Sequence, residues 1–405
     1  MYERIQELMD TLGCDRFPAR WEGFYSEVRE HFLQKGCELL SPAYYTRLRE
    51  RYGVLTEYAE IYEQAALAIS KKPALSLFLA LMARAFADKN EIQADIAALS
   101  LPAAREGEDA FPYDMLPALA VCTAIPSLYE EMKRRGLPDD ILYPSLRTVE
   151  RSIDAFRERN NGAYGMANFN WWCHRYFLGT IYRIGRLEFE LPVSFPNAYR
   201  VLQSKTGEVL SLANMRLHRD GVAIGSLHYE DEEGAYWAAV EETDEAYIGH
   251  PIDKKGRALR EKITLPKSDW QVRLTGGDPV VGIHIPPGGG FSTDALDATF
   301  SRAREILATH FPDFPYRAFV TGTWMLDPQL RDLLGAEGNL VKFGERFTRM
   351  TMKSAGRSVL NFVFLRPQAE TDLTTLPEST RLERALKAHY LAGNAIYETY
   401  GCILK

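Results

Sequence analysis

One segment combines two residue types that group-transfer chemistry needs, a histidine and closely spaced glycines. Its sequence is Val280-Val281-Gly282-Ile283-His284-Ile285-Pro286-Pro287-Gly288-Gly289-Gly290-Phe291-Ser292-Thr293. Glycines between a strand and a helix let backbone N–H groups approach a ligand, and the helix start at Ser292 adds unpaired N–H groups and partial positive charge. The segment predicts a phosphate-binding loop at Gly288, Gly289 and Gly290. A tight strand-to-helix turn explains the same glycines.

Acidic residues bear on this choice. Asp294 and Asp297 fall in the first turns of the expected helix, where they would repel a phosphate. Acids at a helix start also stabilise the helix by themselves.

The elements around this segment divide the chain into two parts. Up to about residue 180 the apolar residues recur at spacings of three and four, which predicts helices, among them 140–159 and 168–183. From about residue 184 apolar and charged residues alternate, which predicts strands. We expect strands at 186–191, 215–218, 222–229, 236–240, 246–252, 262–265, 270–274 and 280–285. We therefore expect a helical domain over 1–180 packed on a mixed α/β domain over 181–405.

The order of elements after the glycines is mixed. An amphipathic helix is expected over 293–310, a strand over 316–321 and a helix from 327 to about 346, broken near 335–338. A hairpin over 348–353 and 358–365 and a last helix over 379–400 close the chain.

Composition limits the possible partners. The 405 residues are 46% hydrophobic and carry 48 Lys+Arg against 55 Asp+Glu, a formal charge of -7, so nucleic acid and anionic membranes are not expected partners. The most apolar stretch, 74–87, is shorter than the roughly 20 residues of a membrane span. The five scattered cysteines predict reduced thiols and, with no signal peptide expected at the N-terminus, a cytoplasmic protein.

The order strand, glycine loop, helix, strand, helix, hairpin resembles the C-terminal half of a GNAT-type N-acyltransferase. In that superfamily the loop that binds the pyrophosphate of coenzyme A reads Arg/Gln-x-x-Gly-x-Gly/Ala. Gly288 and Gly290 match the two glycines, whereas Ile285 stands where Arg or Gln is usual. The resemblance implies that coenzyme A enters between the strand ending at Ile285 and the strand over 316–321.

More specifically, the chain resembles bacterial proteins that join an all-helical N-acyltransferase domain to a GNAT-like C-terminal domain. The segments that carry this resemblance are Leu178-Gly179, Ile184-Gly185-Arg186-Leu187-Glu188-Phe189, Ile283-His284-Ile285-Pro286, Gly288-Gly289, Trp324-Met325-Leu326-Asp327-Pro328 and Asn339-Leu340-Val341-Lys342-Phe343. It implies an α+β fold and transfer of an acyl group from acyl-CoA, such as acetyl-CoA, to a small-molecule or peptide amine. Ser292 then joins Gly288, Gly289 and Gly290 as a cofactor-binding candidate.

Acyl transfer to an amine requires a base for the ammonium, and His284 is the first candidate. Strand alternation places Ile283 and Ile285 on one face and His284 on the other, just before the glycines. Imidazole exchanges protons readily near neutral pH. The alternative is a structural histidine bonded to a neighbouring strand.

Two further pairs of residues are candidates for the same site. His250 could bind substrate and Asp253 could act in catalysis, because they end a nearby strand; a surface histidine and a turn-capping aspartate explain them equally. Trp324 as a substrate contact and Asp327 as a catalytic group end the strand after the loop helix. A core tryptophan and a helix N-cap are their alternatives.

Tyr397 belongs to a string, Tyr397-Glu398-Thr399-Tyr400-Gly401, that resembles the GNAT segment whose tyrosine protonates the departing thiolate. In GNAT enzymes two strands follow that segment. We expect the 348–365 hairpin to supply those strands, so Tyr397 is not assigned this role.

Two other functions remain open. A binding module on a catalytically empty GNAT-like fold accounts for Ile285, the acidic loop helix and the unassigned general acid. A cupin-like metal enzyme accounts for the many strands before His284, but such sites use a His-x-His pair, and the eight histidines contain none. We expect no metal.

Overall fold

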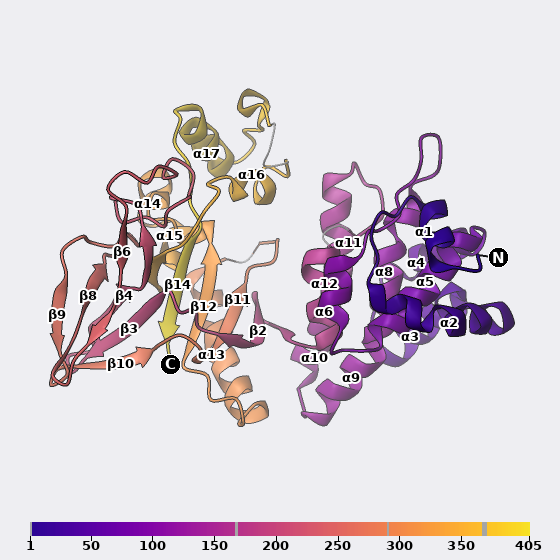
Figure 1. The fold of residues 1–405 in the computed structure, drawn as a ribbon, viewed down its shortest axis with the longest axis horizontal. Coiled ribbons are helices and arrows are strands. Elements are labelled where there is room, and N and C mark those ends of the chain that lie inside the picture. Colours follow the sequence, from indigo (N-terminus) through magenta and orange to yellow (C-terminus); the bar gives the residue numbers. More distant parts are fainter. Residues whose placement is uncertain (1, 167–168, 290, 367–370) are drawn as a thin grey trace. The chain divides into compact units, whose positions relative to one another are not determined.

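The computed structural model describes residues 2–166, 169–289, 291–366 and 371–405. The chain forms two compact units, Met1–Ile184 and Gly185–Lys405 (Figure 1). The first is helical and the second contains sheets and helices, so the α+β fold class predicted from the sequence is confirmed.

The helical unit contains short helices joined by tight turns. Its helices are α1 (Ile5–Leu12), α2 (Glu22–Lys35), α3 (Pro42–Tyr52), α4 (Ala59–Ser70), α5 (Pro73–Phe86), α6 (Ile92–Ala98), α7 (Phe111–Asp114), α8 (Leu116–Val121), α9 (Ile125–Arg134), α10 (Asp139–Leu146), α11 (Thr148–Arg159) and α12 (Phe169–Leu178). Helix α5 is apolar almost all round and largely buried, as expected of a core helix. The stretch Phe111–Arg134 is long and apolar enough to cross a membrane, but 67% of its most apolar window is buried within the protein.

Two predicted helices differ from the sequence pattern: one is divided and the other ends early. The helix expected over 140–159 is divided at Arg147 into α10 and α11, and Pro144 lies inside α10. The helix expected over 168–183 ends at Leu178, because Gly179 adopts a left-handed conformation (φ +68°). Strand β1 (Ile181–Ile184) follows and packs against α10.

The second unit contains a sheet with the strand order β2-β11-β12-β14-β13. These strands are β2 (Leu187–Ser194), β11 (Pro279–His284), β12 (Ala318–Thr323), β14 (Thr399–Leu404) and β13 (Thr348–Thr351). Strands β11 and β12 are parallel and the other pairs are antiparallel. Helix α13 (Thr293–His310) connects β11 to β12 (Figure 1) and covers one face, where Phe300 packs on Phe189 and Phe319.

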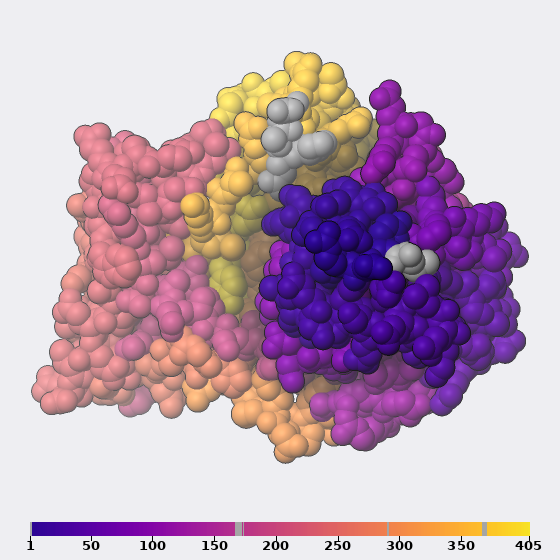
Figure 2. Space-filling model, turned by 45° about the vertical axis from the view of Figure 1, so that its right-hand side comes forward, coloured from indigo at the N-terminus to yellow at the C-terminus, as the bar shows by residue number. Residues whose placement is uncertain are grey.

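A second sheet is inserted between β2 and β11. Its order is β10 (Trp270–Leu274), β3 (Tyr199–Ser204), β4 (Val209–Ala213), β8 (Ala246–Ile252) and β7 (Glu241–Glu242), with β9 (Ile263–Pro266) beside β8 and a separate pair, β5 (Met215–Leu217) and β6 (Tyr236–Ala238). Val201 and Ala213 of this sheet share a core with Val280, Val320 and Cys402 of the first. In the space-filling view the insertion forms a continuous lobe of its unit (Figure 2).

One predicted strand of the insertion does not form. Residues 222–229 make only isolated bridges, and both Gly225 and His228 have positive φ angles. The apolar and polar residues alternate there as in a strand, but the backbone turns twice, so no ladder develops.

The end of the chain differs from the prediction. Residues 358–365 do not form a strand: helix α16 (Ser358–Phe362) occupies most of this stretch. The last helix, α17, covers only Arg381–Leu391 and ends before Gly393 (φ +81°). Thr399–Leu404 is a strand that pairs with both β12 and β13, so β13 and β14 complete the sheet in place of the expected hairpin.

Between β12 and β13 the helical prediction is confirmed in its main features. Helices α14 (Leu330–Leu334) and α15 (Asn339–Gly344) replace one helix, and the break lies at Gly335–Gly338 as expected. Gly335 adopts a φ of +79°, which a residue with a side chain rarely does.

Candidate functional site

The glycine loop lies between the end of β11 and the start of α13. Gly288 has a φ of +113°, and a Cβ atom added at Gly288 or Gly289 would meet nothing within 4 Å. Gly290 lies outside the described residues. Ser292 caps α13, since its side chain accepts a hydrogen bond of 3.3 Å from the N–H of Ala295. The loop therefore presents backbone with open space beside it at a helix N-terminus.

The loop follows the carboxyl end of a parallel strand pair. The register of β11 and β12 consists of Val281 opposite Phe319 and Gly282 opposite Val320. Thr321 Oγ1 then donates to the Ile283 carbonyl at 3.0 Å, while β12 continues to Thr323 in its pairing with β14. The pairing of β11 with β12 therefore ends at Gly282, two residues before the end of β11. Ligands of open α/β sheets bind at this edge.

His284 is the last residue of β11 and forms a pair with a carboxylate on β2. Its Nε2 lies 2.7 Å from Oε2 of Glu190, and the two side chains are 29% and 17% exposed. Strand alternation directs the buried Ile283 and its partner Phe189 toward α13, so His284 and Glu190 lie on the opposite face.

Glu190 is not among the site residues predicted from the sequence. Gly282 lies directly opposite it, and a Cβ at Gly282 would be 3.5 Å from Glu190 Cβ and 3.7 Å from Oε2. The missing side chain leaves room for the carboxylate to reach His284. Glu190 was visible as one of the charged residues in the alternating run 186–191, but only the register pairs it with β11.

Arg186 is the second residue that the sequence analysis did not assign. Its Nη2 donates to the Gly288 carbonyl at 2.8 Å, and its guanidinium carbon lies 5.4 Å from the centre of the Phe291 ring. Nε and Nη1 are buried and have no hydrogen-bond partner among the residues that the structure describes. Burial lowers the pKa of Arg186, but a guanidinium remains protonated.

The acids at the start of α13 are partly neutralised. Arg346 forms an ion pair with Asp297, and its Nη2 lies 3.5 Å from the Thr293 carbonyl. The hydrogen bond from Arg346 lowers the pKa of Asp297. The repulsion expected from the sequence is therefore reduced at one of the two acids, Asp297.

Asp327 and Trp324 lie in the interior of their unit. Asp327 is 3% exposed, and its carboxylate accepts hydrogen bonds from the N–H groups of Gln329 at 2.9 Å and Tyr397 at 2.6 Å. Burial raises the pKa of Asp327. Trp324 is 4% exposed and packs in a cluster with Leu330 and Val341. These are the contacts of a loop anchor and a core side chain.

His250 and Asp253 belong to the inserted sheet. His250 is 7% exposed, its Nδ1 is 3.1 Å from the Leu259 carbonyl and its ring packs on Tyr236. Asp253 Oδ1 accepts from the N–H groups of Lys255 at 2.8 Å and Arg257 at 2.9 Å, which caps a turn. Both side chains are used within this sheet, and no described contact joins them to His284.

Tyr397 lies in the loop between α17 and β14, not in the helices that follow β12. Burial raises its pKa to about 12, and its hydroxyl is 3.1 Å from Nδ1 of His228. The resemblance of 397–401 to the GNAT segment is therefore not matched by its place in the fold.

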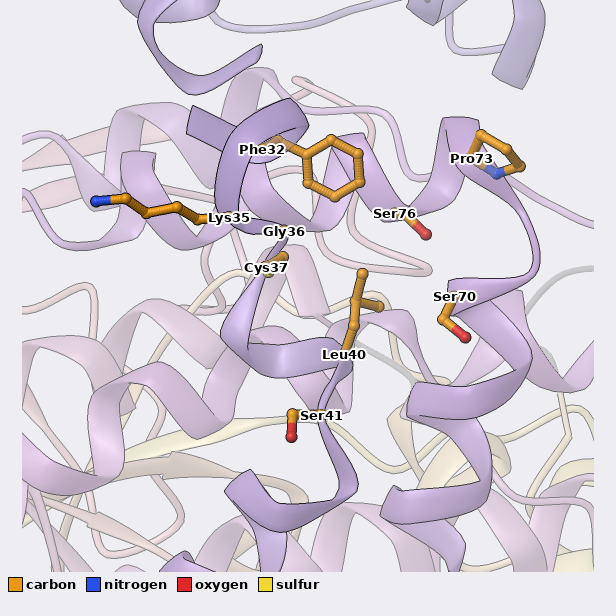
Figure 3. A pocket seen from close by; sticks show the side chains of 9 residues that line it. All are labelled: Phe32, Lys35, Gly36, Cys37, Leu40, Ser41, Ser70, Pro73 and Ser76. Carbon is orange, nitrogen blue, oxygen red and sulfur yellow. The ribbon is translucent and has the colours of Figure 1, made fainter. Parts of the chain in front are cut away.

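The helical unit has a pocket of its own (Figure 3), with a volume of about 380 Å³. Its lining residues are Phe32, Lys35, Gly36, Cys37, Leu40, Ser41, Ser70, Pro73 and Ser76. Burial raises the pKa of the Cys37 thiol to about 11, which keeps it protonated near neutral pH. The Ser70 and Ser76 hydroxyls donate to backbone carbonyls of α4. The described contacts of Cys37, Ser70 and Ser76 thus show none of these three groups activated as a nucleophile.

The described residues contain no group of three or more His, Cys, Asp or Glu side chains placed to hold a metal ion. Two family models match the chain. The model of the N-acyltransferase N-terminal domain matches residues 44–179, and the model of the GNAT-like C-terminal domain matches residues 181–403. The chain therefore belongs to the family that joins an N-acyltransferase N-terminal domain to a GNAT-like C-terminal domain. The match gives no support to the cupin-like alternative, and it confirms the resemblance inferred from the sequence.

Solved structures share the fold along the whole chain. An acyltransferase in complex with CoA and 10C-teicoplanin superposes with a TM-score of 0.63 at 21% identity and covers 98% of both chains. An acyltransferase in complex with decanoyl-CoA gives 0.61 at 20% identity, covering 99% of this chain and 100% of that one. At this identity the likeness establishes the fold alone. No curated protein sequence matches the chain.

Proposed function

We propose that this protein transfers the acyl group of an acyl-CoA thioester to the nitrogen of an amine. The observation that carries the proposal is the juxtaposition at the end of β11 of a histidine–carboxylate pair, His284 and Glu190, with the open loop at Gly288 and Gly289. Structures of the same fold that hold CoA, decanoyl-CoA or octanoyl-CoA support this choice of donor.

The residues present fit the diphosphate of coenzyme A. Side chains are missing where phosphate oxygens would approach Gly288 and Gly289, and α13 points its N-terminus at the same loop. Two buried guanidinium nitrogens of Arg186, beside the loop, have no partner in the described part of the chain. Ser292 caps the helix and borders the site.

His284 is the proposed base. When Nε2–H donates to the Glu190 carboxylate, the lone pair of the ring lies on Nδ1, which takes the proton from the attacking ammonium. The neutral amine then forms a bond to the thioester carbonyl carbon and the C–S bond breaks, and the second proton lost by the nitrogen passes to the departing thiolate. Glu190 fixes the ring orientation and stabilises the imidazolium that forms.

The acceptor in this proposal is a small-molecule or peptide amine. Two acyltransferases of the same fold were solved with teicoplanin or 10C-teicoplanin, which supports a small-molecule acceptor. We place the reaction in the cytoplasm, which the free thiols of Cys14, Cys37, Cys122 and Cys402 support.

The test separates turnover from binding. The full chain is incubated with acetyl-, octanoyl- and decanoyl-CoA and a panel of amines, and free CoA is quantified by chromatography. Calorimetry measures binding of each thioester separately. Release of CoA that depends on the amine supports the proposal. Binding without release on any amine identifies a binding module, and neither binding nor release overturns both readings.

A further inference from the structure

The glycine loop carries no cationic side chain of its own. Residues 285–292 read Ile-Pro-Pro-Gly-Gly-Gly-Phe-Ser, and the acids Asp294 and Asp297 follow at the helix start. Backbone N–H groups alone would have to hold a dianionic ligand there. A positive group must therefore come from another element if the loop binds phosphate.

Arg186 lies at this loop although it is 102 residues away in the sequence. Its Nη2 donates to the Gly288 carbonyl at 2.8 Å, and its guanidinium stacks on Phe291, which in turn packs on Phe343 at a ring distance of 4.9 Å. The Arg186 side chain is thus held between Gly288 and Phe291.

The guanidinium is incompletely satisfied in this arrangement. Nε and Nη1 are buried and have no hydrogen-bond partner among the described residues, and Nη2 donates to the Gly288 carbonyl. A buried donor left without a partner is costly, and more so when it is charged. The carboxylate of Glu188 favours the charged form of Arg186, so a cation is retained at this place.

The other arginine near the loop is already paired. Arg346 is bonded to Asp297 and to the Thr293 carbonyl, so its charge is offset at the helix start. Nε of Arg346 is also buried without a partner among the described residues, but Asp297 offsets the charge of Arg346, and Arg186 has two such nitrogens.

We propose that Arg186 is a ligand-binding residue that clamps the diphosphate of the acyl-CoA donor against Gly288 and Gly289. In the bound state its Nε and Nη donors bond to oxygens of the diphosphate, in the forked geometry that guanidinium offers to phosphate. The inference rests on the proposed function, and it assigns recognition of the donor to an arginine of the turn before β2.

The test uses the full chain and Arg186→Gln, with Arg302→Gln as a matched control that removes the same charge from an exposed ion pair with Glu305 on α13. Calorimetry measures affinity for CoA and for dephospho-CoA, which lacks the 3′-phosphate but keeps the diphosphate. Arg186→Gln is expected to weaken both by about 10- to 100-fold, the size of a charge-assisted hydrogen bond, and Arg302→Gln neither. The preference for acetyl-CoA over acetyl-pantetheine in kcat/KM should fall by the same factor.

Other results would overturn the inference. Unchanged affinity removes Arg186 from the site, loss for CoA alone moves it to the 3′-phosphate, and equal losses of kcat/KM with both thioesters show a purely structural role. Should Arg186→Gln not fold, Arg186→Lys is used, because it keeps the charge but not the forked geometry. It should bind CoA and dephospho-CoA more weakly than the parent and Arg302→Gln do, and its preference for acetyl-CoA over acetyl-pantetheine should also be lower. A parent that binds CoA but never transfers the acyl group defeats the proposed function and leaves this inference standing; a parent that binds neither nucleotide defeats both.

Discussion

Two histidine–carboxylate pairs in the second unit have similar bond lengths and different surroundings. His284 and Glu190 are joined at 2.7 Å, and His218 and Asp231 at 3.1 Å. The His284 ring is 29% exposed beside the glycine loop, whereas the His218 side chain is 2% exposed. The two pairs therefore differ more in the exposure of the histidine ring than in the presence of a carboxylate partner.

The buried pair is tied into its own turn. Nδ1 of His218 accepts from the N–H of Asp220 at 3.2 Å while Nε2 contacts Asp231, and Tyr229 packs against the ring at 5.2 Å. Both ring nitrogens therefore serve the fold. A histidine–carboxylate pair can take part in catalysis only where a substrate can reach the ring, and of these two rings His284 is the more exposed.

The largest effect is expected at the accessible histidine. His284→Gln keeps a hydrogen-bonding group but removes the titratable one, and a general base contributes about 10²–10⁴-fold, so kcat should fall by that factor. The affinity for acyl-CoA should change little, and the acidic limb of the pH–rate profile should disappear. Full turnover in a folded variant would exclude His284 as the base, and loss of folding would favour a structural role.

The next largest effect is expected in the loop. Gly289→Val places a branched side chain in the open space beside the backbone, and misplacing a bound donor by about 1 Å can cost about 10² in kcat/KM. Gly23→Val is the control, because a Cβ at Gly23 also meets nothing within 4 Å. Thermal unfolding with and without acyl-CoA measures the stabilisation by the ligand, which should be lost only in the loop variant. Equal stabilisation of both would reduce the loop to a turn.

A smaller effect is expected from the partner of His284. Glu190→Gln removes the charge that orients the ring and stabilises the imidazolium, and we expect kcat to fall by about 10- to 100-fold. KM for acyl-CoA should stay near that of the parent, which separates positioning of the base from binding of the donor. A change confined to KM would contradict this role.

The buried pair should respond in stability alone. His218→Gln removes at least one of the hydrogen bonds that the buried His218 ring makes with Asp231 and Asp220, so the free energy of unfolding should fall by about 0.5–1.5 kcal/mol in denaturant titrations. Turnover per folded molecule should match the parent. A loss of kcat as large as that of His284→Gln would erase the distinction between the two pairs.

The smallest effect is a pH dependence of the same buried pair. The hydrogen bond from His218 lowers the pKa of Asp231 below its ordinary value near 3.8. A carboxylate with a lowered pKa stabilises the fold above its ordinary pKa, and this contribution is lost as pH falls through the folded value. Asp231→Asn should flatten the acid limb of stability below about pH 4 slightly, since Asp231 is exposed. An unchanged slope would show that other carboxylates carry it.

Local patterns in the sequence predicted much of the fold around the site. The helix over 293–310 and the strands over 246–252 and 270–274 match the structure residue for residue, because their periods and their bounding turn residues agree. The last helix was predicted to reach residue 400, but α17 ends at Leu391 and Thr399–Leu404 form a strand, which only the pairing with β12 and β13 reveals.

The sequence by itself determined the α+β division, the glycine loop and the position of His284 on the strand face opposite the aliphatic residues. These follow from period and composition, which act over a few residues. Only the tertiary structure brought Glu190 to His284 and Arg186 to Gly288, across 94 and 102 residues. It also placed His250, Asp253 and Asp327 in hydrogen bonds that serve the fold. Such partners are set by strand register and by which face is covered, and these depend on the packing of distant segments.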